Sequence, residues 1–502
     1  MLWGITVALW LAVGRLGLAF VRSELHWRTV AEHSRADAPW YYRLAGVWGG
    51  SEGSLLFFAA VVAAVASIAA RRCRGHRAIW FGTATVVVLS SIALLWASPF
   101  DHLDAPAVRG FGLTPILEHP AMAVHPPLLY IGLACSLAAA MTVIDRGSAH
   151  AWLRATVAAT TAAMAIGGLW SYAEQGWGGY WAWDPVENTS LLVWLAALLA
   201  LHAPRPPMLG AVPWVLTLAG AALVRSGAAP SVHAFAAAAT VGWLLLAAAV
   251  TTAGWLAWHA VAADRADRPE RVGGWWDAMV HPVPVLVGSA AFLVVVAGTL
   301  FPPLVDLFGN RRGMVRGEFY SRTVGPLAVV MLPFLLARLR TPAARLAHVG
   351  MVVLCVGVAA STFDRAEIVV VGDGTRVEAA GRAVEGRGVS VEPGPRFDVQ
   401  QVVATVRVDG SVMRPALVAY PERGGVLAET AIHPGLWRDV QVVLLDANDL
   451  GIATLEVRQR PLMWLVWLGA SLTAVGALTA GRRRAVAADR PVGEPAFEPT
   501  VR

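Results

Sequence analysis

Long apolar runs alternate with short polar loops along most of the chain. A helix needs about 20 mostly apolar residues to cross the hydrocarbon core of a bilayer. Twelve runs come near that length, so we expect a polytopic α-helical membrane protein with about twelve transmembrane helices. The first run lacks a basic start and a convincing cleavage site and is predicted to be a retained span. The predicted spans are 2–21, 53–70, 79–97, 123–143, 152–170, 188–203, 209–225, 236–258, 282–301, 324–338, 346–362 and 461–479.

The pattern changes between residues 363 and 460, where the apolar runs are short and rich in β-branched residues. Runs at 368–371, 402–406 and 440–445 are separated by glycine-containing turn signals at 372–374, 409–410 and 424–425. We therefore predict a helical transmembrane core at 1–362 and a small β-rich domain at 363–460. A final span at 461–480 and a disordered tail at 481–502, rich in Pro, Ala and charge, complete the predicted organisation.

Composition supports a membrane protein and excludes several function classes. Of 502 residues, 57% are hydrophobic and only 15% are charged, whereas soluble domains have roughly 25% charged residues. The net charge is +6, but the cationic side chains are arginines that concentrate in short loops beside apolar spans, so they do not imply nucleic-acid binding. The three cysteines form neither a CxxC pair nor a CxxCH motif. Nothing therefore supports a disulfide framework, a zinc site or thiol-disulfide exchange, and the chain is not expected to be a c-type cytochrome itself.

The positions of the arginines predict the orientation of the chain. Arginine-containing loops follow every second span, near residues 71–77, 146–154, 205, 265–271, 338–345 and 482–484. Such loops mark the cytoplasmic side, although one arginine-rich loop at 311–322 would lie outside. The protein is then expected in the cell inner (plasma) membrane, with its β-rich domain facing outside.

A tryptophan-rich segment lies between two apolar runs, within residues 170–195. It contains Trp177, Trp181 and Trp183, and Asp184-Pro185 blocks a helical conformation just before the next span. Such a segment cannot cross hydrocarbon, but it can lie at the membrane surface as a flat aromatic shelf. A flat shelf suits a porphyrin. An ordinary interfacial tryptophan belt is the alternative.

Four of the thirteen histidines lie at unusual depths in the predicted topology. His125 and His233 are at the outer ends of spans, on the same side as the tryptophans. His202 lies 18 residues beyond Asp184, roughly 27 Å along a helix, and His348 opens its span from the inner side. Two imidazoles on opposite faces of a haem iron give bis-histidine ligation, so each pair is a candidate haem site. Each histidine could instead simply hydrogen-bond a neighbouring helix.

These residues lie in motifs that resemble those of a known family. Trp177 to Leu195 resembles the tryptophan-rich WWD signature of haem-handling cytochrome c assembly proteins. Within that superfamily the chain is similar to the CcmF and NrfE haem lyases. Further similar segments are 48–56, 119–130, 223–227, 231–235, 298–302 and the Arg438-Asp439 pair, so the resemblance extends from about residue 40 to 480.

The resemblance implies a role for each candidate residue. Haem as the substrate would be held against the WWD segment by His125 and His233, with Trp177, Trp181, Trp183 and Asp184 forming the platform. His202 and His348 would hold a resident b-type haem within the membrane. From its position, Arg225 is a candidate to pair with a haem propionate, although a simple interfacial arginine is as plausible.

The resemblance also implies partners and a reaction. Haem would arrive from a CcmE-type chaperone and be joined to apocytochrome c presented by CcmH- and CcmI-type subunits. Two departures from the family are apparent: Ser51 replaces a usual histidine, and the chain is shorter than typical members. We expect a haem lyase that promotes thioether attachment. A haem transporter or handover platform without that chemistry is the alternative, and a solute permease is a more remote one.

Overall fold

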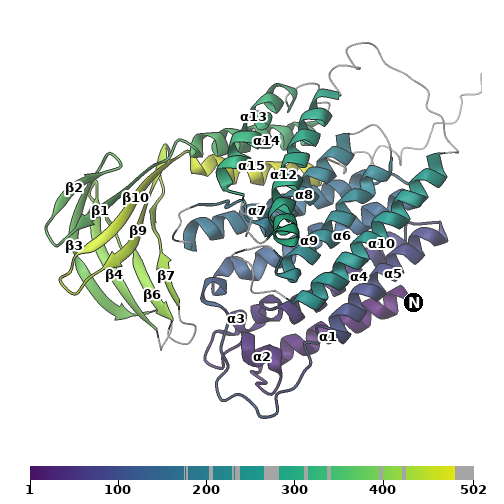
Figure 1. Cartoon of the computed structure of the whole chain (residues 1–502), viewed down its shortest axis with the longest axis horizontal. Helices are drawn as coiled ribbons and strands as arrows, with labels where there is room; N and C mark the ends of the chain where they lie inside the picture. The colour runs from purple at the N-terminus through teal and green to yellow at the C-terminus, as the bar shows by residue number, and fades with distance from the viewer. Residues whose placement is uncertain are drawn as a thin grey trace, which may run out of the picture.

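The computed structural model describes residues 1–174, 176, 179–202, 207–228, 231, 238–264, 282–309, 315–335, 341–394, 399–420 and 425–480. A large helical part is followed by a β-rich part, and the strands gather at one end of the molecule (Figure 1). The helices are α1 Leu2–Val21, α2 Arg28–His33, α3 Trp40–Ala45, η1 Gly46–Trp48, α4 Ser51–Ala70, α5 His76–Leu95, η2 Pro115–Leu117, α6 Pro120–Ile144, α7 His150–Glu174, α8 Pro185–His202, η3 Pro207–Ala211, α9 Val212–Ser226, α10 Ala239–Asp264, α12 Pro282–Phe308, α13 Gly317–Leu335, α14 Pro342–Ser361 and α15 Met463–Thr479.

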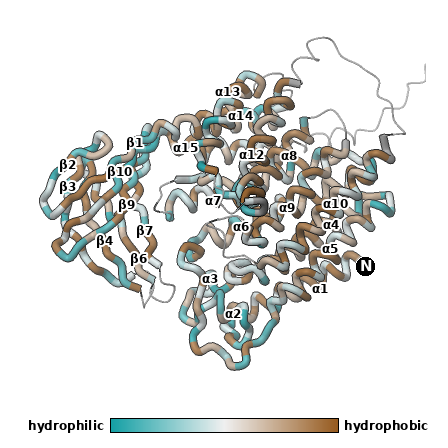
Figure 2. The backbone as a smooth tube through the Cα atoms, viewed as in Figure 1, coloured by the Kyte–Doolittle hydropathy of each residue, from teal (hydrophilic) through white to brown (hydrophobic). Residues whose placement is uncertain are grey.

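Each of the twelve predicted spans falls on helical structure, and the polytopic helical fold is confirmed. Within the described part of the chain, nine helices are long and apolar enough to cross a membrane. The other three predicted spans coincide with α7, α13 and the shorter α15, so the number twelve stays a prediction. The tube coloured by hydropathy is mostly brown over the helices and mixed over the strands (Figure 2).

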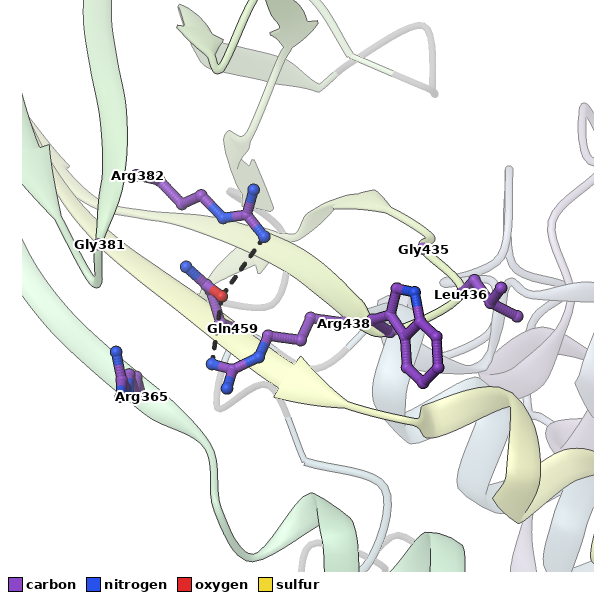
Figure 3. Close-up of a pocket in the computed structure, with 8 residues that line it drawn as sticks. Arg365, Gly381, Arg382, Gly435, Leu436, Arg438 and Gln459 are labelled. Atoms are coloured by element: carbon purple, nitrogen blue, oxygen red, sulfur yellow. Dashed lines mark hydrogen bonds between the residues drawn. The ribbon is translucent and has the colours of Figure 1, made fainter.

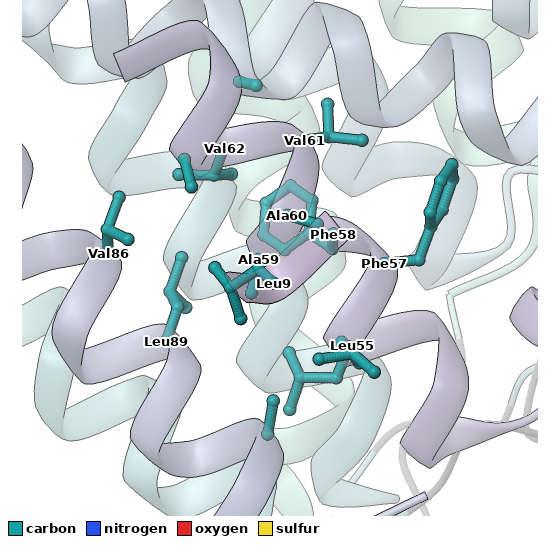
Figure 4. Close-up of a cluster of buried hydrophobic side chains, with 14 of the residues drawn as sticks. Leu9, Leu55, Phe57, Phe58, Ala59, Ala60, Val61, Val62, Val86 and Leu89 are labelled. Atoms are coloured by element: carbon teal, nitrogen blue, oxygen red, sulfur yellow. The ribbon is translucent and has the colours of Figure 1, made fainter. Parts of the chain in front are cut away.

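Helix α4 lies at the centre of the main apolar core. Most of its side chains are buried, it packs against α1, α5 and α6, and the same apolar cluster includes residues of α9 and α10. Leu55, Phe58 and Val62 are at most 3% exposed, and Leu9 and Leu89 of the neighbouring helices pack in the same cluster (Figure 4). Because α4 is apolar on all sides, it is surrounded by other helices, whereas α12 and α14 bury far fewer residues.

Helices α14 and α15 approach each other at backbone distance. A Cβ added to Gly350 would lie 2.4 Å from the backbone nitrogen of Thr473, and one added to Gly476 would lie 2.3 Å from that of Ala347. Small residues allow such close helix packing where no hydrophobic force drives association in lipid. This pair therefore holds α14, which contains His348, in a fixed position.

Among the described residues between α14 and α15, ten strands form two antiparallel sheets, in the region where the sequence predicted β-structure. One sheet has the order β1-β10-β9-β8, and the other has the order β2-β3-β4-β6-β7 with β5 paired to β4. Valines and leucines from both sheets share one core, so the sheets pack as a sandwich. The strands are β1 Arg365–Val371, β2 Arg376–Ala379, β3 Arg382–Pro393, β4 Gln400–Val408, β5 Ser411–Met413, β6 Ala416–Tyr420, β7 Gly425–Glu429, β8 Ala431–His433, β9 Arg438–Ala447 and β10 Ala453–Pro461.

The end of α7 joins the helical part to the sandwich. The buried hydroxyl of Tyr172 donates to Asp439 Oδ2 at 3.0 Å, and Gly176 packs so closely on Ala428 that a Cβ there would lie 2.7 Å from the Ala428 Cβ. The start of the tryptophan-rich segment therefore lies directly against β7. The predicted tail at 481–502 lies outside the described residues.

Candidate functional site

The structure brings His202 and His348 together from two different helices. His202 is the last residue of α8, and His348 lies in the second turn of α14. Their ring centres are 6.0 Å apart and their planes are inclined at 84°. Nδ1 of each ring bonds to a carbonyl four residues earlier: Leu198 at 2.8 Å and Ala344 at 2.7 Å. A nitrogen that bonds to a carbonyl must bear the proton, so Nε2 of each ring is the nitrogen with a lone pair for a metal.

A large apolar cavity adjoins these two histidines. Its volume is about 2240 Å³, well above the range of roughly 300–1,000 Å³ that cofactor sites usually span. Side chains from α7, α8, α12, α13, α14 and α15 line it, and it extends from the tryptophan-rich segment to the histidine pair. Among the lining residues are Trp181, Trp183, Trp194, His202, His348 and Met351.

The arrangement fits a haem bound between His202 and His348. Metal–imidazole bonds are about 2 Å long, so two imidazoles on opposite faces of one iron place their ring centres roughly 6 Å apart. The observed separation is 6.0 Å. The ring separation and the tautomers are compatible with such a site, in which the exposed His202 and the partly buried His348 both line the apolar cavity.

His125 occupies a different place, at the interface of α6 and α7. Its Nδ1 bonds to the Ala163 carbonyl at 2.7 Å, and its ring meets Trp170 edge to face with centres 6.3 Å apart. Gly167 makes room for the imidazole, since a Cβ there would lie 2.7 Å from His125 Cε1. His125 is not among the residues that line the large cavity. Its predicted partner His233 lies outside the described residues.

Of the predicted tryptophan shelf the structure describes Trp181 and Trp183, and these two rings are not coplanar. Trp181 and Trp183 meet edge to face at 89°, with ring centres 6.0 Å apart. Trp183 has a left-handed backbone (φ 57°), and its ring is stacked on Tyr320 of α13 at 4.8 Å. One face of Trp183 is therefore covered by protein. Trp177 lies outside the described residues.

Asp184 holds the segment in place by capping α8. Its Oδ1 accepts from the Val186 backbone nitrogen at 2.8 Å, while Glu187 Oε2 accepts from the backbone nitrogens of Ala182 and Asp184 at 2.9 and 3.2 Å. This reciprocal arrangement resembles a capping box. The Ser231 hydroxyl also donates to Asp184 Oδ1 at 2.8 Å. Asp184 is thus a positioning residue, and Glu187 is a second cap.

Comparisons with known proteins identify the family. Residues 48–227 match the family model described as cytochrome C assembly protein. The probable cytochrome c-type biogenesis protein NrfE of Escherichia coli is 33% identical over 395 residues, which cover 71% of this chain and 71% of that protein. The chain belongs to the CcmF/NrfE family of cytochrome c-type biogenesis proteins.

A second relative matches nearly the whole length of the chain, and a solved structure has the same fold. The cytochrome c-type biogenesis protein CcmF of Pseudomonas aeruginosa is 25% identical over 594 residues, covering 96% of this chain and 90% of that protein. A solved structure named cytochrome c heme lyase CcmF superposes with a TM-score of 0.72 at 20% identity, covering 95% of this chain and 90% of that chain. The family resemblance expected from the motifs is therefore confirmed, and the folds are alike.

In this CcmF/NrfE family member Arg225 is buried inside the helical part. The residue is 6% exposed, and Nη2 of its guanidinium donates to Ser54 Oγ at 3.0 Å. Nε has no hydrogen-bond partner within the described structure. This contact favours a role in joining α9 to α4 over direct contact with a haem propionate. Ser51, which departs from the family pattern, is buried one turn before Ser54.

His119 is a site residue to which the sequence analysis assigned no role. It caps α6, its ring is stacked on Trp170 with centres 6.2 Å apart, and its Nε2 lies 3.6 Å from Glu174 Oε1. The distance is that of an ion pair, but burial lowers the pKa of His119 and favours the neutral ring. The sequence feature that could have indicated His119 is its position just before Pro120, because His125 likewise precedes a proline.

Proposed function

We propose that this protein is the haem lyase of a cytochrome c maturation system. It binds haem at the tryptophan-rich segment and promotes its attachment to apocytochrome c. In that reaction a cysteine S–H adds across a haem vinyl group: a C–S bond forms at one vinyl carbon, and the hydrogen is added to the other. The step is neither oxidation nor reduction overall. It depends on holding haem and thiol in a productive orientation, which is the contribution we assign to this chain.

The observation that supports the proposal most strongly is the pairing of His202 and His348 beside a large apolar cavity. We infer that these two residues would hold a resident b-type haem. Such a group supplies one-electron redox chemistry when bound. The Leu198 and Ala344 carbonyls fix the tautomers, and hydrogen bonds of this kind also raise the basicity of a ligating imidazole.

We assign the substrate haem to the outer side. His125 and His233 are its proposed ligands, and Trp177, Trp181 and Trp183 are the proposed platform. Trp181 and Trp183 line the large cavity, and Asp184 fixes the backbone between them and α8. The perpendicular rings would contact a porphyrin through one face and one edge, an arrangement that aromatic pairs often adopt.

Partners are proposed from the family and from the position of the sandwich. Because the tryptophan-rich segment begins against β7, a protein bound to the sandwich would be close to the platform. We infer that a CcmE-type chaperone delivers haem, and that CcmH- and CcmI-type subunits present apocytochrome c. The arginine-rich loops support an inner-membrane location with this region facing away from the cytoplasm.

The test begins with the full chain purified from a haem-replete host. We expect a bis-histidine Soret spectrum that is lost in His202→Ala and in His348→Ala but kept in His76→Ala, an exposed histidine at the start of α5. A wild-type protein with no Soret absorbance would contradict the proposal and favour a permease.

A second measurement separates the lyase from a haem handover platform. The purified chain, its partners, haem and apocytochrome c are combined under reducing conditions. A lyase yields a c-type cytochrome whose haem resists acid–acetone extraction. Haem that is bound and transferred but stays extractable with all partners present would instead identify a handover platform.

A further inference from the structure

A second pocket lies where the sandwich joins the membrane-spanning helices. It has a volume of about 550 Å³ and is lined by arginines from three strands (Figure 3). Arg365 begins β1 four residues after α14 ends at Ser361. Gln459 lies near the end of β10, just before α15 begins at Met463. This connectivity places the pocket next to the surface of the membrane.

The pocket has an excess of positive charge. Arg382 Nη2 and Arg438 Nη1 each donate to Gln459 Oε1 at 3.4 Å, so two guanidinium groups share one neutral oxygen (Figure 3). Arg382 also pairs with Asp409 at 2.7 Å, whereas Arg365 and Arg438 have no carboxylate partner among the described residues. Arg382 Nε is buried without a hydrogen-bond partner there.

The neighbouring carboxylates are engaged elsewhere. Asp364 pairs with Arg460 at 3.3 Å, and Asp439 accepts from the Tyr172 hydroxyl at 3.0 Å. The lining residues include three arginines and neither aspartate nor glutamate. Asp409 pairs with Arg382, and Glu367 Oε2 accepts from the Ala380 nitrogen beside Gly381, so the formal charge stays positive even when both carboxylates are counted. The hydrogen bond from Arg382 lowers the pKa of Asp409.

Large apolar side chains flank the charged pocket. Leu436 and Trp437 line it and are 64% and 75% exposed, and Phe363 beside it in sequence is 74% exposed. Trp464 Nε1 donates to the Leu436 carbonyl at 2.8 Å, and the Leu462 nitrogen donates to the Trp437 carbonyl at 3.1 Å. These bonds fix the Leu436–Trp437 loop to the start of α15. Exposed tryptophan beside a membrane span is typical of the lipid headgroup region.

We propose that this pocket binds one anionic phospholipid. The phosphate would be bound by Arg365 and Arg438, because a guanidinium donates two parallel hydrogen bonds to phosphate oxygens. The acyl chains would lie along Leu436 and Trp437. The lipid would link β1, β9 and β10 to the bilayer and so hold the sandwich at a fixed height over the tryptophan-rich segment. This proposal is independent of the assignment of the haem ligands.

The test uses the full-length protein, purified in a nonionic detergent and stripped of lipid. Native mass spectrometry follows the binding of phosphatidylglycerol, of phosphatidylcholine, and of phosphatidylglycerol in competition with inorganic phosphate. The variant is Arg365→Gln with Arg438→Gln. The matched control is Arg376→Gln with Arg407→Gln, which removes two exposed arginines from strands of the same sandwich. Gel filtration and circular dichroism verify that both variants fold.

We expect wild type and control to bind one phosphatidylglycerol more tightly than phosphatidylcholine. Each arginine near an anionic lipid contributes on the order of fivefold in affinity, so the double variant should bind it roughly twentyfold more weakly. Trp437→Ala should keep headgroup selectivity and lose the preference for long over short acyl chains. Unchanged binding by the arginine variant would overturn the proposal. Competition by inorganic phosphate at equal concentration would also overturn it, because the pocket would then take a free anion.

Discussion

The proposed inner and outer sites hold their described histidines by the same kind of hydrogen bond, formed in different ways. His202 and His348 each bond to a carbonyl one turn earlier in their own helix. His125 bonds to the carbonyl of Ala163, which belongs to another helix. A bond within one helix forms whenever that helix forms. A bond between helices exists only when α6 and α7 pack correctly.

The packing of α6 on α7 is itself close and depends on glycine. A Cβ on Gly132 would lie 2.8 Å from Thr160 Cγ2, and a Cβ on Gly167 would meet the His125 ring. The orientation of the outer histidine is therefore sensitive to small changes on the neighbouring helix. The inner pair depends instead on how α8 and α14 are placed around the cavity. The two sites should respond separately to substitution.

The substitution expected to affect one proposed haem site most strongly while sparing the other is His125→Ala. Removing a proposed ligand of the substrate haem should lower cytochrome c production by at least about a hundredfold, while the resident haem keeps its spectrum. Production is measured by haem staining of covalent cytochromes in cells, and the spectrum is taken on the purified variant. His76→Ala serves as the control. Loss of the resident spectrum in His125→Ala would show that the two sites are not independent.

A smaller and more specific effect is expected from Gly167→Ala. The new Cβ would lie 2.7 Å from His125 Cε1, so the imidazole must move although it is still present. We expect production to fall roughly tenfold, in the range seen when a group that orients a metal ligand is lost. Gly254→Ala on α10 is the matched control, because a Cβ there meets no atom within 4 Å. Equal activity of the two variants would show that the hydrogen bond from His125 to Ala163, between α6 and α7, does not determine the function of the proposed outer site.

Local patterns in the sequence predicted much of this architecture. Apolar runs located the helices, and β-branched runs such as Ile368 to Val371 located strands of the sandwich. Counting helical rise from Asp184 placed His202 at the depth of His348, and the structure brings the two rings together. These inferences succeed because hydrophobic periodicity and helix length are properties of a short stretch of chain.

Contacts between distant segments were not predictable in the same way. The stacking of Trp183 on Tyr320 joins residues in separate helices, and nothing in either local sequence indicates it. The arginine pocket likewise assembles Arg365, Arg382 and Arg438 from three strands, whose order depends on sheet pairing. The capping of α8 by Asp184 and Glu187 is different, because an acidic pair at this spacing was visible in the sequence.

The cap of α8 connects the two sites, since this helix begins at the tryptophan-rich segment and ends at His202. Asp184→Ala removes the bonds to Val186 and Ser231 and should cost about 1 kcal/mol of stability. Asp184→Asn can still cap and should lose less. Thermal unfolding followed by the resident Soret band measures both. If both substitutions lower the midpoint equally, the charge of Asp184 matters more than its capping geometry.

The smallest expected effect concerns the contact between α7 and the sandwich. Burial raises the pKa of Glu429, and the neighbouring Glu174 carboxylate adds to the shift. The pKa of Glu429 is higher in the folded protein than the unfolded value of about 4.3. The folded state therefore binds a proton more readily than the unfolded state does. Stability should therefore rise as pH falls from neutral through the raised pKa.

Glu429→Gln should remove that dependence and raise the thermal midpoint at pH 7.5 by a degree or two. Glu378→Gln, at an exposed position of β2, should leave both the midpoint and its pH dependence unchanged. Neither substitution should alter the spectrum of the proposed resident haem, because Glu429 and Glu378 are on sandwich strands and do not line the cavity beside His202 and His348. If the thermal midpoint of Glu429→Gln still depends on pH, another carboxyl group is responsible. Glu174 would be the first to test.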